Sequence, residues 1–93
     1  MLNQKSLLMA NRDTRKYELR DSSGNTLYIG ITNDLSRREA EHRNEGMKFS
    51  EMVQIGRATT REAALEWETG ALQDYKESHR GHRPRYNKNN SGK

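Results

Sequence analysis

The 93-residue sequence contains no cysteine, which excludes disulfide bonds and thiolate metal sites. It has one proline, one phenylalanine and one tryptophan, and only 30% of its residues are hydrophobic. A chain this short and this poor in apolar residues can bury only a small core, so we expect a single domain. The apolar run at residues 7–10 is too short to span a membrane. We therefore expect a cytoplasmic (intracellular) protein with no membrane partner.

Basic residues are abundant by contrast. Seventeen Lys and Arg residues against thirteen Asp and Glu residues give a net charge of +4, which favours contact with polyanions. The segment from residue 79 to residue 93 contains no acidic residue. A solubilising tail and a phosphate-binding segment explain this charge equally well. The candidate contacts to nucleic acid are Arg37, Arg80, Arg83, Arg85 and Lys88.

Two short β-type runs, Arg15–Arg20 and Thr26–Ile31, are separated by the polar segment Asp21–Asn25, which contains a glycine. This arrangement predicts a β-hairpin. The segment Phe49–Ile55 is rich in β-forming residues and predicts a third strand. We treat residues 13–88 as the domain, with an N-terminal extension at 1–12 and a flexible tail at 89–93.

Two helices are expected. The first runs from about Leu35 to Glu45, capped by Asn33 or Asp34, and the second starts after Thr59 or Thr60 and continues to about Glu77 or Ser78. On the first, Leu35, Arg38 and His42 share one face, with Glu41 turned elsewhere. An arginine on this inward face should meet an anionic group.

In the second helix the apolar stripe includes Trp67, which we expect to fill the core, and it also contains Glu68. A buried carboxylate needs a counter-charge, hydrogen bonds or a metal ion. A salt bridge to Arg38 or another base would satisfy this need. So would a site for Mg²⁺, which commonly takes only one or two carboxylates.

Tyr17 and Tyr28 lie on the two strands of the predicted hairpin, where tyrosines are usually packing residues. Together with an arginine and a lone carboxylate they suggest a site that cuts phosphodiester bonds. His42 is either a structural histidine or a proton carrier beside a phosphate. Asn87, after the single proline, either caps the chain or supports the site.

These residues resemble the GIY-YIG nuclease family from about Arg15 to Asn87. Tyr28-Ile29-Gly30 is similar to the second signature tripeptide, and Tyr17 matches the tyrosine of the first. The remaining similarities are the run into the first helix with Arg38 and His42, the helix carrying Glu68, and the closing motif Arg83-Pro84-Arg85-Tyr86-Asn87. One departure is that Arg15-Lys16 replaces the Gly-Ile of the first tripeptide.

The resemblance implies an α/β fold in which helices flank a small three-stranded antiparallel sheet. It also implies an endonuclease that hydrolyses DNA and depends on Mg²⁺ or Mn²⁺. Glu68 would hold the metal ion, Tyr17 would act as or orient the general base, and Arg38 would stabilise the transition state. Tyr28, His42 and Asn87 would position water, phosphate or metal.

Two other functions are compatible with the residues. A nucleic-acid-binding or assembly module of the same fold, without turnover, is supported by the basic C-terminal segment and the altered first tripeptide. An RNA-binding α/β protein would need aromatic residues on its sheet for stacking, and the composition offers few. If the protein makes double-strand breaks, one site per chain would need two passes or a homodimer.

Overall fold

The computed structural model describes residues 11–88, so the tail at 89–93 and nearly all of the extension at 1–12 lie outside the described residues. The described residues form a three-stranded antiparallel sheet in the order β2-β1-β3 and two helices. The predicted α/β architecture is therefore confirmed. Its elements, in chain order, are β1 (Arg15–Arg20), β2 (Thr26–Thr32), α2 (Leu35–Asn44), β3 (Glu51–Gln54) and α3 (Arg61–Ser78).

The turn between β1 and β2 is organised by one aspartate. The carboxylate of Asp21 accepts hydrogen bonds from the backbone N–H groups of Ser23 and Asn25, both at 2.9 Å. Gly24 follows with a φ of 86°, a conformation that favours glycine. These contacts close the predicted hairpin.

The register of this hairpin decides which side chains share a face. Tyr17 pairs with Gly30, and Leu19 pairs with Tyr28. Paired and alternate residues point to the same side of a sheet, so the two tyrosines lie together on one face. The buried core cluster that contains them consists of Tyr17, Leu19, Leu27, Tyr28 and Phe49, which come from β1, β2 and the segment before β3.

The third strand is shorter than predicted, because it covers Glu51–Gln54 rather than Phe49–Ile55. Ser50 and Ile55, which flank it, still donate backbone hydrogen bonds to β1 at 2.8 Å each. Phe49 lies before the strand, and its side chain is buried in the core.

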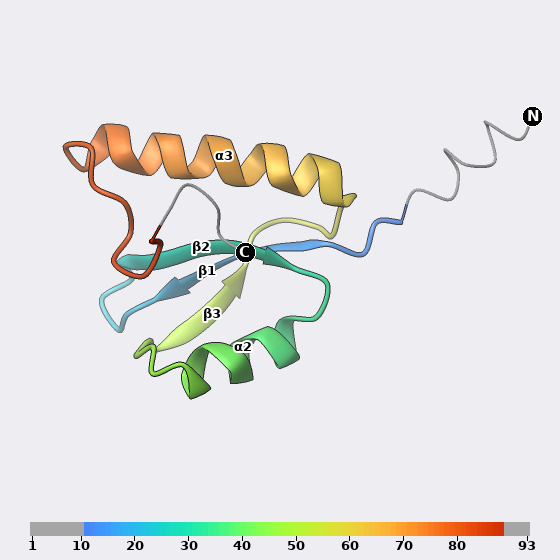
Figure 1. Ribbon diagram of the computed structural model, residues 1–93, viewed down its shortest axis with the longest axis horizontal. Helices are drawn as coiled ribbons and strands as arrows, with labels where there is room; N and C mark the ends of the chain where they lie inside the picture. The colour runs from blue at the N-terminus through green and yellow to red at the C-terminus, as the bar shows by residue number, and fades with distance from the viewer. Residues whose placement is uncertain (1–10, 89–93) are drawn as a thin grey trace, which may run out of the picture.

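Both helices begin at caps that the sequence predicts. The Asp34 carboxylate accepts from the N–H of Arg37 at 3.0 Å, and the Thr60 hydroxyl accepts from the N–H of Ala63 at 3.2 Å. Just beyond α2, Gly46 has a φ of 89° and turns the chain toward β3. Figure 1 shows α3 along one side of the sheet and α2 on the other.

The inward line of α3 consists of Ala64, Glu68 and Leu72, which are all buried. Trp67 lies beside this line and is only partly buried, with the Nζ of Lys16 6.0 Å from its ring centre. The expectation that Trp67 fills the core is wrong, because the helix directs the adjacent position at the sheet. No helix within residues 11–88 is long and apolar enough to cross a membrane.

Candidate active site

The two hairpin tyrosines and a histidine from α2 form one buried cluster. The rings of Tyr17 and Tyr28 are 6.0 Å apart between centroids, and the His42 ring meets the Tyr28 ring edge-on at 4.7 Å. The hydroxyl of Tyr17 lies 2.7 Å from Nε2 of His42. Tyr17 and His42 are both fully buried, with 0% exposure. The fold thus joins the Tyr17 phenol to the histidine by a short hydrogen bond, and the Tyr28 ring contacts the same histidine edge-on.

The protonation states in this cluster follow from its burial. Burial, followed by the nearby Tyr28, raises the pKa of Tyr17 although Arg38 opposes the shift. Burial and then the charge of Arg38 lower the pKa of His42, with Glu45 opposing. Both groups are therefore neutral near pH 7, and the Tyr17 hydroxyl donates to Nε2 in the tautomer of His42 that carries its hydrogen on Nδ1.

The other ring nitrogen of His42 then carries its hydrogen. Nδ1 is buried and has no hydrogen-bond partner among the described residues, but it faces Oε1 of Glu45 at 3.6 Å. This arrangement leaves Nε2 as the acceptor, so a proton released by Tyr17 has a place to go.

Arg38 lies against both phenols, and we call Tyr17, Tyr28, Arg38 and His42 the phenol cluster. The guanidinium interacts electrostatically with Tyr28 and Tyr17, and it forms ion pairs with Glu41 at 2.9 Å and Glu45 at 3.6 Å. Burial acts to lower the pKa of Arg38, but the bond to Glu41 and the two phenols raise it above its ordinary value. Arg38 is therefore permanently charged.

The helical wheel placed Glu41 off the inward face, and its side chain is indeed 44% exposed, yet its carboxylate reaches Arg38. Residues three apart on a helix are neighbours, and long side chains close the remaining gap. The anionic group that the inward arginine needed is supplied by its own helix, through Glu41 and Glu45.

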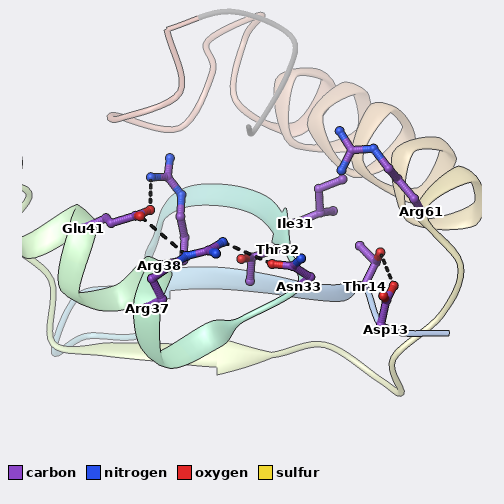
Figure 2. A pocket seen from close by; sticks show the side chains of 9 residues that line it. All are labelled: Asp13, Thr14, Ile31, Thr32, Asn33, Arg37, Arg38, Glu41 and Arg61. Atoms are coloured by element: carbon purple, nitrogen blue, oxygen red, sulfur yellow. Dashed lines mark hydrogen bonds and ion pairs between the residues drawn. The ribbon is translucent and has the colours of Figure 1, made fainter. Parts of the chain in front are cut away.

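An open cavity of about 480 Å³ adjoins the phenol cluster, and we call it the Arg38 cavity. Arg38 belongs to both, whereas neither tyrosine lines the cavity within the described part of the chain. Figure 2 shows Arg37 and Arg38 on one side of the cavity and Arg61, at the start of α3, on the other. Its full lining is Asp13, Thr14, Ile31, Thr32, Asn33, Arg37, Arg38, Glu41 and Arg61.

Arg37, one of the predicted nucleic-acid contacts, lies on the rim of this cavity. Its side chain is 55% exposed, donates to Asn33 at 3.1 Å and forms a long ion pair with Glu41 at 3.6 Å. Arg61 was not among the sequence candidates, although it faces the same cavity. Only the folding of α3 against the end of β2 reveals it.

Glu68 is 2% exposed and points inward from α3. Burial is the largest influence raising the pKa of Tyr28; Glu68 adds to it, while Arg38 opposes it. The carboxylate therefore lies within electrostatic reach of the phenol cluster. No group of three or more acidic or histidine side chains that could hold a metal ion occurs in residues 11–88. A single carboxylate remains compatible with Mg²⁺, which retains water and binds substrate oxygens.

Asn87 is buried and uses its whole side-chain amide on β2. Its Oδ1 accepts from the N–H of Ile29 at 2.8 Å, and its Nδ2 donates to the carbonyl of Ile29 at 2.9 Å. The preceding residue, Tyr86, donates its N–H to the carbonyl of Leu27 at 2.8 Å. In this structure Asn87 therefore supports the strand that carries Tyr28.

The remaining predicted nucleic-acid contacts are not near the Arg38 cavity. The contact of Tyr86 with Leu27 places their segment beside the start of β2, whereas the cavity borders the end of that strand. All four are exposed: Arg80, Arg83, Arg85 and Lys88. They lie on the segment that follows α3, apart from the Arg38 cavity.

No protein-family model, curated protein or solved structure matches this chain. The functional argument therefore depends on the geometry. That geometry brings Tyr17, Tyr28, Arg38 and His42 into contact and Glu68 into electrostatic reach, and it assigns Asn87 to the edge of the sheet.

Proposed function

We propose that the protein is a divalent-metal-dependent endonuclease that hydrolyses DNA phosphodiester bonds, as the GIY-YIG nucleases it resembles do. The observation that carries the proposal is the phenol cluster, in which Tyr17 bonds to a neutral histidine and lies within electrostatic reach of an arginine. The same arginine faces an open cavity bordered by two more arginines. A proton-accepting pair beside an open cavity lined by three arginines is suited to phosphodiester hydrolysis.

The scissile phosphate would enter the Arg38 cavity and bind the guanidinium of Arg38. A planar, permanently charged fork can hold two phosphate oxygens at once. It stabilises the additional negative charge that develops as water attacks phosphorus. Arg37, on the rim, would contact a neighbouring phosphate.

Tyr17 would activate the water through a relay. Its raised pKa shows that the neutral phenol resists losing a proton to solvent. The phenol oxygen instead takes a proton from water while its own proton passes to Nε2 of His42, 2.7 Å away. The hydroxide forms a bond to phosphorus, the bond to the leaving oxygen breaks, and that oxygen takes a proton from solvent.

Access to Tyr17 requires Arg38 to move. Tyr17 has 0% exposure, and the side chain of Arg38, which interacts with it electrostatically, is 18% exposed. A phosphate in the cavity competes with Glu41 and Glu45 for the guanidinium. Binding of substrate would thereby uncover the phenol at the moment when it is needed.

Glu68 would hold the Mg²⁺ or Mn²⁺ ion. A bound divalent ion supplies Lewis-acid polarisation of the phosphate and neutralises charge on the leaving oxygen. The fit rests on the chemistry of the donor: a hard carboxylate oxygen beside the phenol cluster suits these ions. Tyr28 interacts electrostatically with both Arg38 and Glu68, and it would hold the phosphate-binding arginine and the metal-binding glutamate in position relative to each other.

The second candidate is a nucleic-acid-binding module without turnover. The complete burial of Tyr17 and the pairing of Arg38 with Glu41 favour it, because both keep the site closed in the absence of substrate. The two functions share the basic surfaces and differ in whether metal ions produce cleavage.

The test is cleavage of supercoiled plasmid, branched and single-stranded DNA with Mg²⁺, with Mn²⁺ and with EDTA. We expect metal-dependent cutting by the wild type that Glu68→Gln abolishes. Glu66→Gln is the matched control, since it removes the same charge from the exposed side of the same helix. Cutting retained by Glu68→Gln would overturn the mechanism. A folded wild type that binds DNA and never cuts it would establish the silent module.

A further inference from the structure

A second basic cavity lies beside the first, outside the phenol cluster. It has a volume of about 530 Å³ and is lined by Arg12, Lys16, Arg57, Ala58 and Thr59. We call it the Lys16 basin. Its lining contains three cations and no acidic residue.

The backbone that carries these cations is held in place. Thr14 and Thr59 exchange backbone hydrogen bonds at 2.9 and 2.8 Å, and Ile55 donates to the carbonyl of Lys16 at 2.8 Å. Gly56, with a φ of 68°, turns the chain so closely that a Cβ on it would lie 3.5 Å from Nζ of Lys16. The basin is therefore a feature of the fold that joins the N-terminal segment, β1 and the loop after β3.

The charges of the basin are available to a ligand. In residues 11–88 every ion pair involves other cations, so none of Arg12, Lys16 and Arg57 is paired with a carboxylate. The Lys16 amine lies 6.0 Å from the Trp67 ring centre, a contact that leaves its positive charge in place. Three like charges gathered without counter-charge favour a polyanion.

The position of the Lys16 basin next to the Arg38 cavity indicates which polyanion it binds. Thr14 lines the Arg38 cavity, and its bridge partner Thr59 lines the Lys16 basin, so the two cavities flank the same bridge. Arg61, two residues after Thr59, faces the Arg38 cavity. Basic groups on both sides of one short bridge match a ligand that presents phosphates in series.

We propose that the Lys16 basin binds the sugar-phosphate backbone of the DNA duplex next to the cleavage point. This inference rests on the nucleic-acid-binding part of the proposed function, and it assigns residues absent from the sequence candidates. Lys16 stands where the resembled family has the Ile of its first tripeptide, so the basin is a feature of this chain's own sequence.

The test measures binding of a fluorescently labelled DNA duplex in EDTA over a series of salt concentrations. For Lys16→Gln combined with Arg57→Gln, we expect the slope of log affinity against log salt to fall by about 0.9 for each removed cation. Near 0.1 M salt this corresponds to roughly eightfold weaker binding per cation. The matched control is Lys48→Gln combined with Lys76→Gln, which removes two charges elsewhere.

The outcomes separate the two proposals. Equal slopes for the basin variant and the control variant would overturn the basin while leaving the nuclease proposal intact. If the basin variant binds DNA more weakly and the wild type never cuts DNA, the basin proposal would be upheld and the nuclease proposal overturned. If the loss of Lys16 lowers thermal stability, Arg57→Gln alone decides the question, since Arg57 is exposed and makes none of the described hydrogen bonds.

Discussion

The phenol cluster and the Lys16 basin both contain cations, but they differ in whether these cations are paired with carboxylates. In the cluster, Arg38 interacts electrostatically with two phenols and is paired with Glu41 and Glu45. In the basin, Lys16 and Arg57 have no carboxylate partner among the described residues. Chemistry needs oriented groups shielded from water, whereas backbone binding needs charges that can exchange counterions for phosphates.

The largest expected effect separates two adjacent arginines. Replacing Arg38 with Gln should lower the single-turnover cleavage rate by about 10²- to 10³-fold, because the transition state loses an oriented charge. Arg37→Gln, on the exposed rim, should weaken DNA binding and leave the rate at saturating protein almost unchanged. Equal losses of rate in the two variants would contradict the division of roles between them.

A second comparison concerns the two phenols. Tyr17→Phe keeps the ring but removes the hydroxyl that bonds to His42, so we expect a loss of about a hundredfold in single-turnover rate. Tyr28→Phe should lose less, because Tyr28 orients groups and takes no proton in the proposed relay. Both variants should fold, as judged by circular dichroism. A Tyr17→Phe enzyme of normal rate would remove the relay.

Stability should depend on Asn87 far more than on its basic neighbour. Asn87→Ala leaves the buried N–H and carbonyl of Ile29 without partners, which should cost about 2 to 4 kcal/mol of unfolding free energy. Lys88→Ala, on an exposed side chain, should change it by about 0.5 kcal/mol or less. Urea unfolding of both variants measures the difference.

The smallest effect is a pH dependence of stability from His42. Its pKa in the folded protein lies below the ordinary value of about 6.5, mainly through burial. As pH falls below that value, the unfolded chain binds the proton first, so stability present at neutral pH is lost. His42→Gln should flatten the profile of unfolding midpoint between neutral and mildly acidic pH. An unchanged profile would mean that other groups cause the dependence.

Much of the fold could be predicted from the sequence because its signals are local. Asp34 and Thr60 cap helices within one turn, and Asp21 closes the hairpin within four residues. The bounds of β3 were predicted less accurately, since an apolar residue such as Phe49 can be buried in the core without belonging to the strand.

The site was predictable only where residue types recur in a familiar order. That order correctly suggested Tyr17, Tyr28, Arg38 and His42 as neighbours, although their function is still a prediction. It did not suggest the Lys16 basin, because Lys16 and Arg57 are 41 positions apart in the chain and meet only through the pairing of β1 with β3.

The carboxamide of Asn87 presents an acceptor and a donor to Ile29 just as a peptide group in an adjoining strand would. It therefore covers part of the outer edge of β2. An uncovered edge strand can pair with strands of other molecules. Detachment of this side chain under mild heating would expose the unsatisfied N–H and carbonyl of Ile29. Resistance to aggregation, and not only folding free energy, would then depend on a single side chain.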